Sequence, residues 1–179
     1  MIKSVIEISN LINQQLMKVG NIVDLFEKDD YEALELWLLW LKDSETLLKK
    51  YNYSETSLLA GLRANILKEQ KSEERRKRKQ IISQALTTID VAQNILFTLN
   101  KQLEDKINTV RTLIRQILIP AKEAGLITQE NITDFSQYLE SLLQQFKQHQ
   151  QLAPSINNAI ALIGKFDVLR IIAEEIDFS

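Results

Sequence analysis

Side chains that could do chemistry are few in this chain, and their spacing supports no catalytic site. There is no cysteine and only one histidine, His149, which excludes disulfides, thiolate zinc sites and cysteine nucleophiles. A di-iron helical bundle needs a glutamate three residues before a ligating histidine, but that position holds Phe146. The four glycines stand far apart, without the clustering that a phosphate loop or a serine-nucleophile turn requires. We therefore expect a protein that is not an enzyme and binds no metal ion or other cofactor.

A block of five consecutive cations is the sharpest charged feature: Arg75, Arg76, Lys77, Arg78 and Lys79. The segment from Lys68 to Lys79 has seven basic and three acidic residues, a local net charge of +4 in a chain of net charge −2. Such a block could neutralise the phosphates of a nucleic acid or of lipid headgroups. No aromatic residue interrupts it, so base stacking is not indicated. A solvated charged surface and binding to nucleic acid or acidic membranes both remain open.

An uninterrupted apolar run, Leu36 to Leu41, is the second feature, and it contains Trp37 and Trp40. Six apolar residues in a row cover every side of a helix, so this segment is buried on all sides or meets a partner. Tryptophan fills protein cores and is also enriched where partners bind. The sequence leaves two interpretations, core filling or a partner interface formed by Leu36, Trp37, Trp40 and Leu41.

Helices are predicted to position both features. With four glycines and two prolines in 179 residues, little material is available for hairpin turns, so a β-rich fold is not expected. Apolar residues at steps of three and four predict helices over about residues 2–27 and 31–50, and a third helix that starts near Ser54. Two further helices are expected, one over about residues 132–149 and a last one that opens at Pro154 and is buried or bent at Gly164.

The segment between Gly61 and Pro120 runs 58 residues without a glycine or a proline. Its apolar residues recur at steps of three and four: Ile82, Ala85, Ile89, Ala92, Leu96, Leu99, Leu103, Ile107, Val110, Ile114 and Ile117. This heptad spacing predicts a coiled-coil-like helix over residues 80–119, with a local stutter between Leu103 and Ile107. We expect Pro120 to end or kink it. Residues 68–80 are either a solvated charged turn, with a new helix that starts near Ser72, or a helical extension.

These patterns together predict an all-α protein. We expect one domain over residues 1–179, an up-and-down bundle of five or six helices built around the long helix. The first residues lack the apolar centre of a signal peptide. The longest apolar run, six residues, is far below the ~20 needed to cross a bilayer. A cytoplasmic protein without a transmembrane segment is therefore expected.

No motif in the chain is diagnostic of a protein family. The heptad-like leucines and charged faces of the first three predicted helices are similar to those of bacterial flagellar export chaperones, and no residue role follows from that likeness. With no catalytic set present, we expect a non-catalytic interaction protein, adaptor or chaperone-like. It would bind a helix of a protein partner or associate with itself. Binding of nucleic acid or acidic membranes through Arg75–Lys79 is the alternative.

Overall fold

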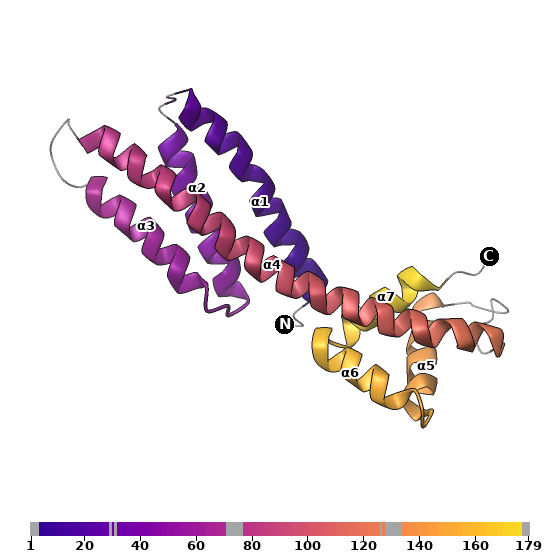
Figure 1. Ribbon diagram of the computed structural model, residues 1–179. Coiled ribbons are helices and arrows are strands. Elements are labelled where there is room, and N and C mark those ends of the chain that lie inside the picture. The colour runs from indigo at the N-terminus through magenta and orange to yellow at the C-terminus, as the bar shows by residue number, and fades with distance from the viewer. Residues whose placement is uncertain are drawn as a thin grey trace. The chain divides into compact units, whose positions relative to one another are not determined.

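The computed structural model describes residues 4–28, 30, 32–70, 77–125, 127 and 134–176, and the side chains of all of these except 69, 70 and 77–79. This part of the chain forms seven helices and contains no strand (Figure 1), so the predicted all-α class is confirmed. The helices are α1 (Val5–Glu27), α2 (Ala33–Lys50), α3 (Thr56–Gln70), α4 (Lys77–Glu123), α5 (Phe135–Gln148), α6 (Ala153–Ile163) and α7 (Lys165–Glu175).

The predicted count of five or six helices was too low, because the expected last helix is divided at Gly164. That residue has φ 89° and ψ 156°, and it lies between α6 and α7. This backbone conformation is open almost only to glycine, since a Cβ atom would be strained there. The Gly164 N–H still donates to the Ile160 carbonyl at 2.8 Å, which closes α6 before the chain turns.

Replacing Gly164 with alanine is expected to lower the free energy of unfolding by about 2 kcal/mol. A Cβ at this position would have no heavy atom within 4 Å, so the cost arises from the backbone conformation and not from a clash. Gly61 is the matched control, because it lies in α3 without a positive φ and also in open space. Gly61→Ala should raise stability by up to about 1 kcal/mol. Urea denaturation measures both, and equal shifts in the two variants would contradict this account.

The long helix α4 has 47 residues and ends four residues later than predicted, because it continues through Pro120 to Glu123. A proline inside a helix removes one hydrogen bond and crowds the preceding turn. Ile117, Leu118 and Ala121, on either side of Pro120, are all buried, and this packing supports the helix beyond the proline. The Pro120 carbonyl accepts from the Ala124 N–H at 2.9 Å. The question of a helix start near Ser72 lies outside the described residues.

The apolar seam of α4 is placed as the spacing predicts. Every residue of the seam is buried except Ile82 and Ile107, which are half-buried. The contacts of the chain group into two compact units, an N-terminal unit of Asn10–Lys101 and a C-terminal unit of Met1–Ser9 with Gln102–Ser179. The stutter between Leu103 and Ile107 thus lies just after the boundary between the two units. This grouping does not test whether the chain folds as one domain, so that stays a prediction.

The N-terminal unit is held by buried apolar side chains and a few polar contacts between helices. Asn100 of α4 is buried and its amide donates to the Asn13 amide oxygen of α1 at 2.9 Å. Such an amide pair in an apolar seam fixes the register of two helices, because a shifted register would leave both amides unsatisfied. Arg63 of α3 forms an ion pair with Glu45 of α2 at 2.8 Å.

In the C-terminal unit, Asp167 of α7 caps the start of α1. Asp167 is fully buried, and its carboxylate accepts from the Ser4 hydroxyl at 2.7 Å and from the Val5 and Ile6 N–H groups at 2.5 and 3.3 Å. The Ser4 hydroxyl oxygen in turn accepts from the Glu7 N–H at 3.0 Å. The first N–H groups of a helix have no partner within the helix, and here Asp167 satisfies those of Val5 and Ile6, which lie 162 and 161 positions away in the chain.

Candidate partner-binding groove

Three of the four residues predicted to form a partner interface are buried in the N-terminal unit. Trp37, Trp40 and Leu41 have exposed fractions of 0%, 3% and 0%, whereas Leu36 is exposed at 36%. The Trp37 and Trp40 rings stack with their centroids 4.7 Å apart and their planes 13° from parallel. Both tryptophans are thus core residues in this structure, and Leu36 is the exposed member of the predicted set. The interface itself stays a prediction.

The two indole N–H groups are satisfied inside the unit. Trp37 Nε1 donates to the Thr88 hydroxyl at 2.9 Å, and that hydroxyl donates to the Ala85 carbonyl at 2.6 Å. Trp40 Nε1 donates to the Gln15 carbonyl of α1 at 2.8 Å. The first chain of hydrogen bonds ties α2 to α4, and the second bond ties α2 to α1.

A shallow groove of about 220 Å³ opens between α1 and α2 next to the Trp40–Gln15 contact. It is lined by Gln15, Lys18 and Ile22 of α1 and by Leu36, Leu39, Trp40 and Asp43 of α2. Steps of three and four place each of these sets on one side of its helix. The groove therefore runs along both helices.

The groove has an apolar floor and exposed leucines on its α2 side. Ile22 and Trp40 are buried, at 7% and 3% exposed, and form the floor. Leu36 and Leu39 are exposed, at 36% and 51%, and stand on the α2 side. Leu39 was not among the predicted interface residues, although its place in the run Leu36–Leu41, three residues after Leu36, was a signal for it.

Three polar groups of the groove lack a partner within the part of the chain that the structure describes. The Gln15 side-chain oxygen is buried and accepts no hydrogen bond there. Lys18 and Asp43, on opposite sides of the groove, are exposed and form no ion pair with a described residue. An occupant with complementary charges and a hydrogen-bond donor could satisfy all three.

Two larger grooves differ in their charged residues. A groove of about 380 Å³ between α5 and α7 has an exposed Phe166, but its charged residues are already paired, Glu140 with Lys165 and Arg170 with Glu174. A groove of about 480 Å³ beside Leu58 and Val91 has Glu55 as its charged residue. Of the three, the α1–α2 groove has unpaired charges of both signs.

The basic block lies partly outside the described residues. Arg75 and Arg76 are among those outside, while Lys77, Arg78 and Lys79 begin α4 with side chains that are not described. The first turn of α4 has no acidic residue. The positive end of the helix dipole therefore coincides with cationic residues, which favours an anion near this helix start.

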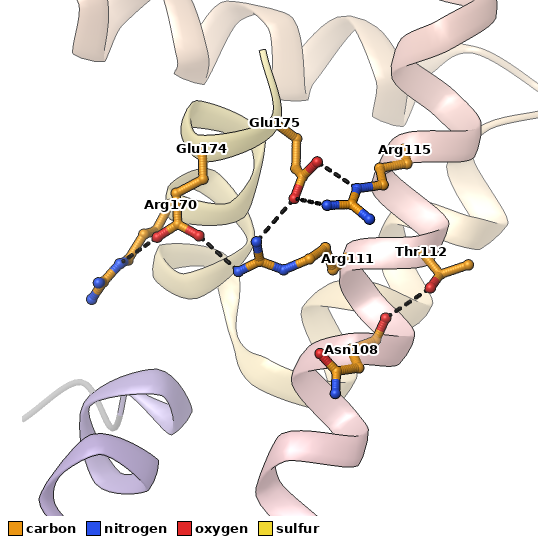
Figure 2. Close-up of polar contacts among 7 residues, drawn as sticks. All are labelled: Asn108, Arg111, Thr112, Arg115, Arg170, Glu174 and Glu175. Atoms are coloured by element: carbon orange, nitrogen blue, oxygen red, sulfur yellow. Dashed lines mark hydrogen bonds and ion pairs between the residues drawn. The ribbon is translucent and has the colours of Figure 1, made fainter. Parts of the chain in front are cut away.

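An ion-pair network joins α4 to α7 in the C-terminal unit (Figure 2). Glu175 accepts from Arg111 and Arg115, and Glu174 accepts from Arg111 and Arg170. The hydrogen bond from Arg115 lowers the pKa of Glu175, helped by the positive charges of Arg115 and Arg111 and opposed by burial. The same hydrogen bond raises the pKa of Arg115. All the acidic and basic groups drawn here have partners within the network, which indicates a structural role.

The lowered pKa of Glu175 predicts a loss of stability in acid. A carboxylate whose pKa is lower in the folded than in the unfolded state stabilises the fold above its unfolded value, and this contribution disappears as the pH falls through the folded value. Stability should therefore fall below about pH 4.5. Glu175→Gln removes the contribution of this carboxylate. The unfolding free energy of the variant should therefore fall less steeply as the pH is lowered through the acidic range. Urea denaturation of both proteins between about pH 3 and pH 7 tests this. Parallel stability profiles for the natural chain and the variant would disprove it.

His149 is exposed at the end of α5, and no three histidine, cysteine or acidic side chains lie together as metal ligands among the described residues. None of the described helices has the length and apolar character needed to cross a bilayer. Comparison of the chain with protein-family models, curated proteins and solved structures found no match.

Proposed function

We propose that this chain is a non-catalytic interaction protein, adaptor or chaperone-like, that binds an amphipathic helix of a protein partner in the α1–α2 groove. The observation that carries this proposal is the pair of exposed leucines, Leu36 and Leu39, beside the buried floor of Ile22 and Trp40. Its location is proposed to be the cytoplasm, in keeping with a chain that has no cysteine.

A helix fits this groove better than an extended peptide or a small ligand. The residues on both sides recur with the helical spacing, so a third helix laid between α1 and α2 would meet side chains at every turn. The volume of about 220 Å³ is below the range typical of small-molecule sites. An extended peptide would need a sheet edge for its backbone hydrogen bonds, and the described part of the chain has no strand.

Selection from a displayed library of amphipathic helical peptides tests this function. We expect peptides that bind the full chain, and we expect Leu39→Asp to weaken their binding by more than about tenfold, because a carboxylate would have to be desolvated in the interface. Leu58→Asp is the matched control, an exposed leucine on α3 at 55%. Circular dichroism checks that both variants fold. Failure to select any helical binder, or equal losses in the two variants, would overturn the proposal.

Self-association through the same groove is the second form of this function. Sedimentation velocity would show it as a mass that rises with protein concentration, and Leu39→Asp would return the chain to a monomer. An assembly that is unchanged in the variant would show that the groove is not the contact between copies.

Binding of nucleic acid or acidic membranes through Arg75–Lys79 is a second candidate function. It is favoured by the start of α4 at Lys77 without an acidic residue in its first turn. Affinity for DNA, RNA or vesicles with phosphatidylserine should then fall steeply with salt. Replacing all five residues with glutamine should abolish that affinity, and unchanged affinity would disprove this function.

A further inference from the structure

The unpaired charges of the α1–α2 groove indicate which helix it binds. We propose that its occupant is an amphipathic helix of a protein partner whose apolar stripe has an acidic residue on the flank facing Lys18 and a basic residue on the flank facing Asp43. This inference rests on the proposed function and adds the positions of two charges on the partner helix.

The positions of the two charges follow from the contact between α1 and α2. The two helices, which end at Glu27 and begin at Ala33, run antiparallel (Figure 1). Trp40 donates to the Gln15 carbonyl, which sets these residues side by side. Lys18 is three residues beyond Gln15 on α1, and Asp43 is three residues beyond Trp40 on α2. The charges are therefore displaced in opposite directions, by about 9 Å in total along the groove.

A helix that lies in the groove would meet these charges at two defined places. A separation of about 9 Å corresponds to about six residues of a helix. In a heptad, a g position and the following e position lie on opposite flanks of the apolar stripe at nearly this spacing, and charged pairs there set the choice and the direction of a partner. A helix with both charges of the wrong sign, or one inserted in the reverse direction, would place like charges together.

The other charged residues of the α1–α2 surface do not satisfy these two groups. Lys18 and Asp43 form no ion pair with any described residue, whereas the charged residues of the α5–α7 groove are paired within the chain. Exposed pairs of this kind contribute little to affinity, on the order of 0.2–1 kcal/mol. They are therefore expected to control which helix binds, while Leu36 and Leu39 supply most of the affinity.

The test is a selection with defined charge positions. The probe is a displayed library of helical peptides of about three heptads, with leucine fixed along the stripe and the flanks varied among glutamate, lysine and glutamine. We expect the selected peptides to have an acidic residue on one flank and a basic residue on the other, about five or six residues apart. Lys18→Glu in the full chain should weaken the best peptide about fivefold. Exchanging the peptide's acidic residue for lysine should restore binding to that variant.

Matched controls separate the failure of this inference from failure of the proposed function. Lys101→Glu and Asp90→Lys reverse charges at exposed positions of the same unit outside the groove, and they should leave binding unchanged. Binding that requires Leu39 but responds equally to Lys18→Glu and Lys101→Glu would disprove the charge assignment and leave the helix-binding function standing. Absence of any binding that depends on Leu39 would overturn both.

Discussion

Replacing Trp37 with alanine is expected to lower the free energy of unfolding by about 4 kcal/mol, the largest effect predicted for this chain. Trp37 is fully buried, stacks on Trp40 and donates a hydrogen bond to Thr88. Alanine would leave a large cavity between α2 and α4 and an unsatisfied acceptor at Thr88. Chemical denaturation followed by circular dichroism measures the change.

Two milder substitutions separate the contributions of Trp37. Trp37→Phe keeps an aromatic ring against Trp40 and should cost about 2 kcal/mol, and Thr88→Val removes the hydroxyl alone and should cost about 1 kcal/mol. A loss below about 1 kcal/mol for Trp37→Ala would show that the residue is not part of the core. If the double variant Trp37→Ala/Trp40→Ala destabilises the chain but leaves every association intact, neither tryptophan belongs to the interface.

Replacing Asp167 with alanine is expected to cost about 3 kcal/mol, the second largest effect. The Ser4 hydroxyl and the Val5 and Ile6 N–H groups would lose their acceptor. Ser4 and Ile6 are buried, so water does not readily replace the carboxylate. The first turn of α1 should fray, and hydrogen exchange of the amides that follow it should quicken.

An ordinary cap is the control for Asp167. Asp134 caps α5, its carboxylate accepts from the Ser136 and Gln137 N–H groups at 2.9 and 3.2 Å, and it is exposed. Asp134→Ala should cost only about 1 kcal/mol, because water can reach those groups. Equal costs for the two aspartates would show that burial and the link between distant segments add nothing at Asp167.

Most of the helices that the sequence predicted follow from one rule, the helical periodicity of apolar residues. The α4 seam from Ala85 to Ile117 is buried nearly as the steps of three and four require, because side chains at that spacing must share one face of a helix. The same rule placed α1 and α2 within a few residues of their observed bounds.

The sequence did not predict the features that depend on backbone conformation or on contacts between distant residues. The sequence predicted a buried or bent position at Gly164, but not the positive φ that divides the expected helix into two, since a glycine within an apolar pattern is equally compatible with a continuous helix. The continuation of α4 past Pro120 depends on the tertiary burial of its neighbours. No local pattern could join Asp167 to Ser4, since 163 positions separate them.

The sequence predicted part of the α2 side of the candidate groove and none of its α1 side. The apolar run Leu36–Leu41 indicated that some of its residues could remain exposed, but only the packing of α1, α3 and α4 around α2 decides which. Trp37 and Leu41 face the core, whereas Leu36 and Leu39 border the groove. The contribution of Lys18 and Gln15 from α1 could not be foreseen, because the register between two helices is not contained in either one.

The most direct test of the central claim is to map where a helix binds. A peptide from the selection would be titrated into the isotope-labelled full chain, and amide and methyl chemical shifts would be followed by NMR. Helix binding in the α1–α2 groove predicts saturable shifts centred on Lys18, Ile22, Leu36 and Leu39. Shifts centred instead on Leu58 and Val91, or on Phe166 and Leu169, would place the helix in another groove and contradict the claim.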